Sequence, residues 1–382
     1  MELKIPLADI DFDKEEEEAV LRVLRSRWLT MGAVTQEFEQ AFAQYVGAKH
    51  ALAVSNCTQA LHLACLALGI GENDEVILPS LSFVATANCV LYSGAEPVFA
   101  DILGNHDLTI SPQDIEKKIT EKTRAIIMMH YGGYACQIEE ILEIARKNRL
   151  AVIEDAAHAP GAVFANRHLG TWGDVGCYSF FSNKNLATGE GGMIVTDRDD
   201  VAERVKLLRS HGMTSLTWDR HRGHAYTYDV MALGYNYRID EIRSALGLAQ
   251  LHKLEGNNAR RRYITDIYRQ RLSEGDFLGI ETPFLSNSCL PACHLFPILL
   301  PAAANRLELI TGLRKRGIQT SIHYPPIHLF TYYQQRFPGI RLPETEQVAA
   351  RELTLPLFPM MSEADVQYVL DGVCEEMRQA VH

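Results

Sequence analysis

Short apolar runs alternate along the chain with longer segments whose apolar residues recur three and four positions apart. The runs have strand length, and the spacing between them is typical of amphipathic helices. Strands that alternate with helices build a mainly parallel sheet with helices on its faces. The pattern therefore predicts the α/β class. Strands are expected at residues 51–54, 76–78, 97–100, 125–129, 151–154, 176–180 and 192–196, and helices at 58–68, 83–92, 138–147 and 201–210.

The two ends of the chain carry different patterns. Residues 14–25 and 35–46 are typical of two amphipathic helices, and a long helical pattern begins near Asp240 and continues to Arg262. We expect a large domain at residues 1–250 and a smaller α/β domain at 251–382. In the small domain the pattern predicts strands at 294–300 and 319–324 and helices at 305–316 and 363–378.

Composition and charge restrict the classes of function. The 382 residues include 37 Lys and Arg and 48 Asp and Glu, so the net charge is 37 − 48 = −11. A chain this acidic repels a phosphate backbone, and we expect no nucleic-acid partner. No apolar run approaches the roughly 20 residues that cross a bilayer, and the first residues lack a signal-peptide pattern. We therefore expect a cytoplasmic protein without a membrane segment.

The cysteines give no sign of a disulfide framework or a metal site. Eight of them are scattered through the chain, which favours reduced thiols. Cys289, Cys293 and His294 lie close together, but no second ligand pair stands at zinc spacing, and we predict no metal.

Lys184 is the first candidate for chemistry. It follows the run at 176–180 and precedes the glycine-rich residues 189–192, where backbone can approach closely. A lysine whose surroundings remove its proton can form a Schiff base. The ordinary alternative is a lysine on a surface loop.

Asp155 and His158 are its companions. Asp155 ends an apolar strand 184 − 155 = 29 residues before Lys184. A carboxylate opposite a Schiff-base lysine suits pyridoxal phosphate, because it keeps the pyridine nitrogen protonated. His158 could stack on that ring or bond its phenolic oxygen. Without the lysine segment, a helix cap at Asp155 and a core histidine at His158 would be the favoured interpretations.

A strand-to-helix turn at residues 54–61 offers a place for a phosphate. Free backbone N–H groups and the positive end of a helix favour an anion there. The turn lacks the spacing of nucleotide-binding loops, so a cofactor phosphate fits better. An ordinary N-cap by Ser55 or Asn56 is the alternative explanation.

Together these segments resemble the DegT/StrS-type sugar aminotransferases, pyridoxal-phosphate enzymes with the type I aspartate aminotransferase fold. The resemblance covers nearly the whole chain. It implies a large cofactor-binding domain with a seven-stranded sheet and a small C-terminal α/β domain. The matching motifs are residues 28–32, 69–77, 130–133, 154–159, 182–185, 189–192, 234–238 and 323–326.

The resemblance also implies roles for single residues. Lys184 corresponds to the cofactor's lysine and proton shuttle, Asp155 to the pyridinium partner, and His158 to the group near the phenolic oxygen. Asn236 corresponds to a residue that reaches the cofactor phosphate of the partner subunit, which implies a homodimer with shared active sites. The remaining positions are Thr58, Gln59 and Ser179 for the phosphate, Phe83 for the ring face, and Arg27, Trp28, Arg238, His323 and Tyr324 for the sugar and nucleotide.

These roles imply a transamination in two half-reactions, with pyridoxamine phosphate formed in the first. The donor is glutamate or glutamine, and the acceptor is a keto group on a nucleotide-linked sugar, in amino-sugar and polysaccharide biosynthesis. Two alternatives stay open: the same chemistry on a keto-cyclitol, as in aminoglycoside pathways, and a non-catalytic regulator that retains the fold. Residues 210–224, which are polar, aromatic and basic, are expected to close over the substrate.

Overall fold

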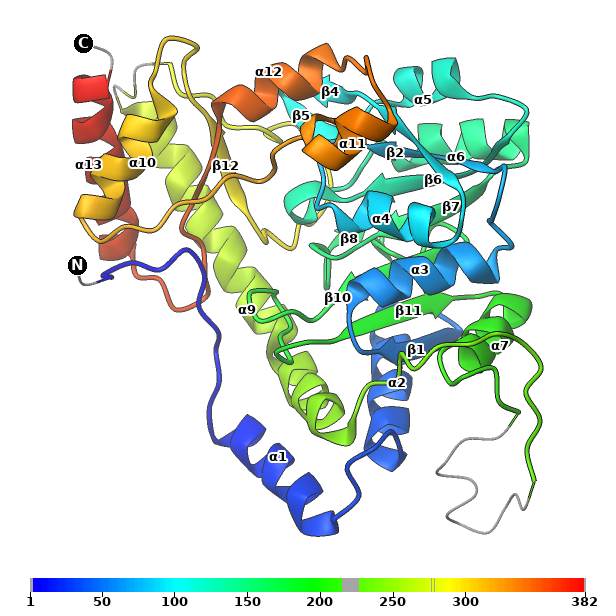
Figure 1. The fold of residues 1–382 in the computed structure, drawn as a ribbon. Coiled ribbons are helices and arrows are strands. Elements are labelled where there is room, and N and C mark those ends of the chain that lie inside the picture. The colour runs from blue at the N-terminus through cyan, green and yellow to red at the C-terminus, as the bar shows by residue number, and fades with distance from the viewer. Residues whose placement is uncertain (1–2, 215–226, 276, 278, 381–382) are drawn as a thin grey trace.

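The computed structural model describes residues 3–214, 227–275, 277 and 279–380. They form a seven-stranded sheet in the order β1-β11-β10-β7-β6-β2-β3, with helices on both faces (Figure 1). Neighbouring strands pair in parallel except at β11, which is antiparallel to β1 and β10. The predicted α/β class and mainly parallel seven-stranded sheet are confirmed. The strands are β1 (His50–Val54), β2 (Glu75–Pro79), β3 (Glu96–Ala100), β6 (Thr123–Met129), β7 (Ala151–Asp155), β10 (Val175–Ser179) and β11 (Gly192–Thr196).

The predicted helices begin and end close to the predicted positions, with the exception of the long helix. None of the described helices is both long and apolar enough to cross a membrane. They are α1 (Lys14–Ser26), α2 (Ala33–Val46), α3 (Cys57–Ala67), α4 (Ala85–Tyr92), α5 (Pro112–Lys118), α6 (Ile138–Asn148), α7 (Asp199–Leu208), α9 (Glu241–Glu274), α10 (Arg306–Lys315), α11 (Thr331–Arg336), α12 (Pro343–Arg351) and α13 (Glu363–Ala380), with short 3-10 turns at Tyr131–Gly133 and Ile327–Leu329. Helix α9 continues past Arg262 to Glu274, and α5, α11 and α12 were not predicted.

The sheet separates two apolar cores because successive side chains of a strand point to opposite faces. In β1, Leu52 and Val54 pack on the face covered by α3, α4 and α7. Ala51 and Ala53 pack on the other face, with α2 and α6. The strands are buried on both faces, and the sheet is therefore a rigid platform for residues at its edges.

The C-terminal part contains a second, two-stranded antiparallel sheet of β12 (Phe296–Leu299) and β13 (Glu352–Leu355). The strand predicted at 319–324 is wrong. Ile318 and Ser321 make only isolated bridges, to Ile5 and Thr354, and two prolines follow at 325 and 326. Since proline has no N–H to donate, the segment cannot extend its pairing. Short hairpins at β4 (Ile102–Gly104) with β5 (Asp107–Ile110) and β8 (Val163–Phe164) with β9 (Arg167–His168) complete the strands.

Helix α9 connects the two parts. It has 34 residues and passes through position 250, where the domain division is predicted, without a break. Near its beginning it packs against α1 and α2, and near its end against α13. Ile5 from the N-terminal segment belongs to the same apolar core as Ile298 and Leu309 of the C-terminal part. The division at residue 250 stays a prediction.

Candidate active site

Three strands of the large sheet lead to one cavity. Asp155 ends β7, Ser179 ends β10, and β1 runs into the turn before α3. In sheets of this kind, ligands bind at the carboxyl ends of the strands. The cavity has a volume of about 600 Å³. The predicted site residues that line it are Thr58, Gln59, Phe83, Asp155, His158, Ser179, Lys184, His323 and Tyr324.

The side chain of Lys184 is partly buried at this cavity. Its Nζ lies 3.4 Å from Nε2 of His294. Burial disfavours the ammonium form and lowers the pKa of Lys184 from 10.5 to about 8, although Cys57 and Asp155 act in the opposite direction. Part of the Lys184 amine is therefore neutral near pH 7. Only this neutral form can act as a nucleophile or a base.

Asp155 is a buried acid whose two oxygens accept hydrogen bonds from neutral groups. Thr86 Oγ1 donates to Oδ2 at 2.7 Å, and the N–H of Ala157 donates to Oδ1 at 3.2 Å. Burial raises the pKa of Asp155, and these two hydrogen bonds oppose that effect. Among the described residues Asp155 forms no direct salt bridge, although the charge of Lys184 also lowers its pKa from a longer distance, and its carboxyl lies in the cavity wall.

His158 and Tyr324 form a second polar pair in the wall. Nδ1 of His158 accepts the N–H of Gly132 at 3.2 Å, and Nε2 lies 2.9 Å from the hydroxyl of Tyr324. The accepting Nδ1 cannot carry the ring hydrogen, so Nε2 carries it in the neutral ring. Burial, with Lys184 and His323 nearby, holds the pKa of His158 well below its ordinary value. His158 is thus a neutral hydrogen-bond donor at this position.

The turn before α3 contains an N-cap and also leaves groups free for a phosphate, which were the two alternatives for this segment. Asn56 is the N-cap and accepts the N–H of Gln59 at 3.0 Å, whereas the Ser55 hydroxyl donates to the carbonyl of Arg238 at 2.7 Å. The N–H groups of Cys57 and Thr58 open the helix, where no intrahelical acceptor exists. Within the described residues, the buried Oε1 of Gln59 has no hydrogen-bond partner. The cavity side of this turn therefore still has groups available for a ligand.

Gly192, the first residue of β11, allows this arrangement. A Cβ atom at this position would lie 2.6 Å from the backbone carbon of Asn56. Any side chain would push β11 away from the turn, so the close approach predicted for the glycine-rich stretch is present.

The chemistry of these residues fits pyridoxal phosphate. A buried acid without a direct salt bridge suits a pyridinium nitrogen, the opening of α3 suits a phosphate, and Lys184 supplies an amine. The ring of Phe83 is 56% exposed beside them. When bound, this cofactor supplies an electron-withdrawing ring that stabilises a carbanion.

Four predicted residues do not line the cavity within this chain. Asn236 forms an isolated bridge with Ser210, and Arg238 contributes its carbonyl to Ser55. Arg27 ends α1 in the left-handed conformation, and Trp28 follows it. Their proposed roles stay predictions. Most of the segment expected to close over the substrate, residues 210–224, lies outside the described residues, which omit 215–226.

Several residues that line the cavity or contact its predicted residues were not predicted, and Thr86 and His294 are two of them. Thr86, which binds Asp155, stands four positions after Ser82, and a hydroxyl pair at this helical spacing was its only signal. His294 was considered only as a metal ligand. It lies 110 residues from Lys184 in the sequence, and no local pattern connects them.

The family of the chain follows from comparison with known proteins. A model of the DegT/DnrJ/EryC1/StrS aminotransferase family matches residues 10–374. The chain belongs to this family, and the resemblance noted in its sequence is confirmed. The protein is an aminotransferase.

Individual relatives are similar over almost their full length. The spore coat polysaccharide biosynthesis protein SpsC of Bacillus subtilis is 40% identical over 375 residues, which are 96% of this chain and 95% of SpsC. PseC of Helicobacter pylori, an aminotransferase involved in the biosynthesis of pseudoaminic acid, has a TM-score of 0.92 and 31% identity, with 98% and 100% covered. The sugar aminotransferase Spr1654 of Streptococcus pneumoniae, described as putative and known in PMP and PLP forms, has TM-scores of 0.91. Its PMP form is 26% identical, with 99% and 100% covered.

Proposed function

We propose that this aminotransferase uses pyridoxal phosphate to move an amino group from glutamate or glutamine to a keto group of a nucleotide-linked sugar, in amino-sugar biosynthesis. The observation that carries the proposal is the arrangement of Lys184 and Asp155, a partly buried amine and a buried acid at one cavity that form no ion pair with each other. The names of SpsC and PseC, which concern polysaccharide and amino-sugar biosynthesis, support the substrate class.

Each side chain has a task in this proposal. The neutral amine of Lys184 would take the proton from the donor's α-carbon, hold it as an ammonium and give it back later in the same half-reaction, so the lysine gains and loses no proton overall. Asp155, as the carboxylate, would hold a positive charge at the ring nitrogen of the bound cofactor. His158 donates a hydrogen bond at the cavity wall, and Thr58 and Gln59, which line the cavity, would hold the cofactor's phosphate.

In the proposal, a few local groups bind the anionic nucleotide sugar although the chain as a whole is acidic. His323 and Tyr324 lie in the cavity wall, and they are candidates for contact with the sugar. Arg27 and Arg238 lie elsewhere in this chain, and in the proposal they contact a diphosphate when two subunits assemble. A guanidinium binds phosphate oxygens through two parallel hydrogen bonds, so a few arginines suffice.

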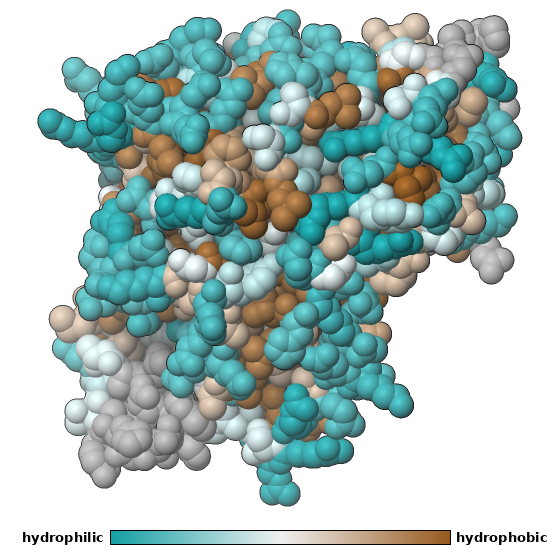
Figure 2. Space-filling view, turned by 180° about the vertical axis from the view of Figure 1, so that it is seen from behind, coloured by the Kyte–Doolittle hydropathy of each residue, from teal (hydrophilic) through white to brown (hydrophobic). Residues whose placement is uncertain are grey.

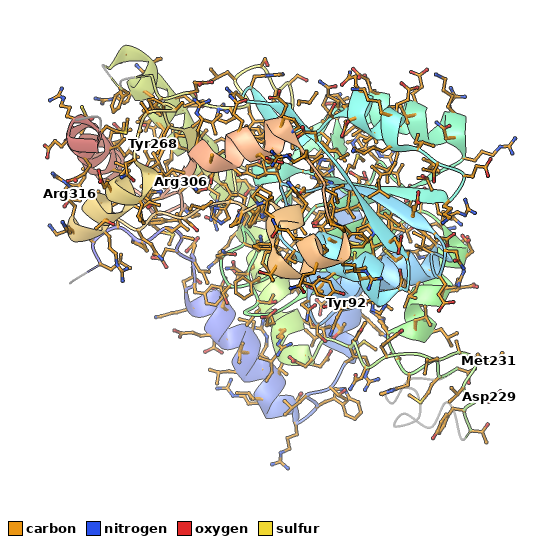
Figure 3. All side chains as sticks on the ribbon, turned by 45° about the horizontal axis from the view of Figure 1, so that its top comes forward. Tyr92, Asp229, Met231, Tyr268, Arg306 and Arg316 are labelled. Atoms are coloured by element: carbon orange, nitrogen blue, oxygen red, sulfur yellow. The ribbon has the colours of Figure 1, made fainter. Side chains whose placement is uncertain are left out.

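A homodimer is part of the proposal. The residues just before Asn236 carry large apolar side chains on the surface, and Val230, Met231 and Leu233 are 57%, 65% and 88% exposed. Met231 and Asp229 lie at the edge of the molecule in Figure 3, and further hydrophobic patches interrupt the hydrophilic face in Figure 2. Exposed apolar groups of this kind favour contact with another chain. Light scattering should give twice the chain mass of 42.8 kDa.

A spectroscopic experiment tests the chemistry. Protein purified with pyridoxal phosphate should show the absorption of a lysine-bound cofactor, and borohydride should fix the cofactor at Lys184 in a peptide map. The variant Lys184→Ala should lose the fixed label. A label that persists in this variant would refute the assignment.

Half-reactions then identify the substrates. Glutamate and glutamine are added separately, and loss of the lysine-bound absorption identifies the donor. The aminated enzyme is next mixed with a keto-sugar nucleotide or with a keto-cyclitol. Conversion by the nucleotide alone supports the proposal, conversion by the cyclitol alone supports the alternative acceptor, and no reaction with any donor supports a regulator.

A further inference from the structure

His294 contacts Lys184 from behind the cavity wall. The residue is 5% exposed and precedes β12, far from Lys184 in the sequence. Its Nε2 lies 3.4 Å from Nζ of Lys184, and its Nδ1 lies 3.0 Å from Oδ1 of Asn185, the neighbour of Lys184. Its ring also lies 4.4 Å from the ring of His158, between centroids. The histidine is therefore held on both ring nitrogens.

The hydrogen bonds of Asn185 fix which nitrogen of His294 carries the hydrogen. Nδ2 of Asn185 donates to the carbonyl of Ala292 at 2.7 Å and to Oδ1 of Asn258 at 2.8 Å. A backbone carbonyl only accepts, so this atom is the amide nitrogen, and Oδ1 of Asn185 must accept from His294. Asn258 is oriented in turn by donation from its Nδ2 to the carbonyl of Pro160 at 2.8 Å.

His294 consequently has a defined neutral form. Its Nδ1 carries the hydrogen and donates to Asn185, which leaves a lone pair on Nε2 directed at Lys184. Burial, together with Lys184 and His158 nearby, holds the pKa of His294 well below its ordinary value. The ring therefore stays neutral and does not take the proton from the lysine. His158 has the opposite tautomer, because its Nδ1 accepts from Gly132.

We propose that His294 is a positioning residue, whose bare Nε2 accepts one N–H of the Lys184 amine and thereby directs the amine's lone pair into the cavity. A neutral amine has two N–H groups and one lone pair, so holding one N–H restricts where the lone pair points. The Asn185–Asn258 hydrogen bonds preserve this role by fixing the tautomer. The inference rests on the proposed function of Lys184 as the base.

The contact with His294 also stabilises the protonated form of Lys184. When the amine takes a proton from substrate, it becomes an ammonium with three N–H groups, and its bond to Nε2 becomes charge-assisted. Such bonds are roughly twice as strong as neutral ones. The proton remains on Lys184 and returns to the substrate, while His294 gains and loses none.

Two substitutions of His294 separate positioning from packing. In His294→Asn the amide lies at the position of Nδ1, which keeps a partner for Asn185 and removes the acceptor at Lys184. In His294→Gln the longer side chain places an amide oxygen near the position of Nε2, which restores the acceptor. The exposed His252, which contacts Glu15 on the surface, provides the control His252→Asn.

The first measurement uses the apoprotein and needs no catalysis. Reductive methylation of Lys184 is followed by mass spectrometry as a function of pH, which gives its apparent pKa. We expect that pKa to fall by about one unit in His294→Asn, because the ammonium loses an acceptor bond. His294→Gln should return it toward the wild-type value, and His252→Asn should leave it unchanged.

The second measurement is the half-reaction with the amino donor. We expect its maximal rate constant to fall about tenfold in His294→Asn with unchanged donor affinity, and to recover partly in His294→Gln. Asn185→Ala removes the group that fixes the tautomer of His294, so it should lower both the pKa of Lys184 and the rate constant. This variant replaces His294→Asn if that protein does not fold. Wild-type values for pKa and rate in His294→Asn or Asn185→Ala would overturn the inference. Failure of the wild-type protein to fix pyridoxal phosphate at Lys184 would instead overturn the proposed function.

Discussion

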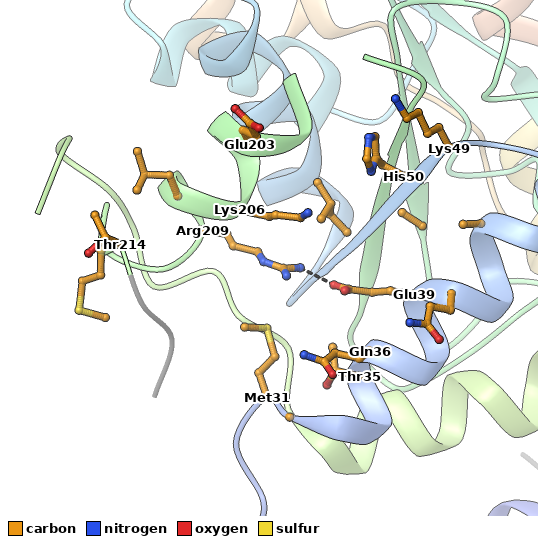
Figure 4. Close-up of a pocket in the computed structure, with 17 residues that line it drawn as sticks. Met31, Thr35, Gln36, Glu39, Lys49, His50, Glu203, Lys206, Arg209 and Thr214 are labelled. Carbon is orange, nitrogen blue, oxygen red and sulfur yellow. Dashed lines mark hydrogen bonds and ion pairs between the residues drawn. The ribbon is translucent and has the colours of Figure 1, made fainter. Parts of the chain in front are cut away.

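Two cavities of the protein have similar size but differ in whether their acidic and basic side chains pair with each other. The second, with a volume of about 740 Å³, lies between α2, α7 and β1 (Figure 4). There Arg209 and Glu39 point at each other, and Nη1 of Arg209 lies 2.5 Å from Oε1 of Glu39. In the first cavity, Lys184 and Asp155 each bind other, neutral groups.

The pairing of the charged side chains indicates which cavity is the candidate active site. A paired acid and base satisfy each other, and Glu39 also accepts the N–H of Ala53 at 2.8 Å. An amine and an acid buried apart keep unsatisfied charge, and perturbed pKa values of this kind cluster at functional sites. Cavity size alone does not distinguish the two sites, whereas the pairing of their charges does.

The largest effect is expected from removing the acid of the first cavity. Asp155→Asn keeps an acceptor for Thr86 but cannot hold a positive charge, so amino transfer should fall by about 100- to 1,000-fold. The thermal midpoint of the apoprotein should change little, because the side chain keeps its shape. Stopped-flow absorbance and calorimetry measure the two quantities, and a variant that loses stability but retains its rate would contradict the comparison.

Removing the acid of the second cavity should have the reverse outcome. Glu39→Leu leaves Arg209 buried without its partner, and the free energy of unfolding should fall by about 3 kcal/mol. The rate of amino transfer per folded molecule should stay at the wild-type value. Urea unfolding measures the loss, and the double variant with Arg209→Leu should recover part of it.

A third buried acid connects stability to pH. Glu352 accepts from the hydroxyl of Thr354 at 2.5 Å and from the N–H of His323 at 2.8 Å, and burial raises its pKa from 4.5 to about 8. Below pH 4.5 the carboxyl is protonated in both the folded and the unfolded states. Between 4.5 and 8 only the folded state keeps the proton, so stability falls as pH rises through this window and levels off above it.

Glu352→Gln should remove this dependence. The loss attributable to Glu352 amounts to about 1.4 kcal/mol per pH unit within the window, and the amide does not titrate. Melting temperatures of both proteins between pH 5 and 9 measure the difference, which should favour the variant increasingly up to pH 8. Parallel curves would show that Glu352 is ionised in the folded protein throughout.

The smallest effect is expected at the margin of the second cavity. Lys206 lines it with an exposed side chain. If the paired charges leave this cavity without an anion site, Lys206→Gln should change neither the melting temperature nor the rate, with or without millimolar inorganic phosphate. A phosphate-dependent rise in melting temperature that disappears in the variant would place a second anion site here.

The sequence predicted the elements of the fold and the residues at the strand ends well. Apolar periodicity is local, and it placed Asp155 and Lys184 at the same edge of the sheet. Which groups touch there depends on side chains from distant segments. Thr86 and His294 were missed because their contacts form only when α4 and the start of β12 are packed.

The C-terminal part was predicted less well for a similar reason. A strand was predicted at residues 319–324, but the partner of β12 is β13, which was not identified from the sequence. A strand exists only where a neighbour supplies hydrogen bonds, and composition does not name the neighbour. The contact of Asn236 with a second subunit is a prediction for the same physical reason.

Helix α9 is expected to couple the unfolding of the two parts. Along its length of about 50 Å it supplies side chains to three separate apolar cores. These residues are Ala245 and Ala249 in the first core, Leu251 and Leu254 in the second, and Ile264 and Tyr268 in the third. Unfolding of either part would expose apolar side chains of α9, while the same helix still packs in the core of the other part. We therefore expect a thermodynamic coupling between the seven-stranded sheet and the C-terminal sheet that is transmitted through one continuous helix.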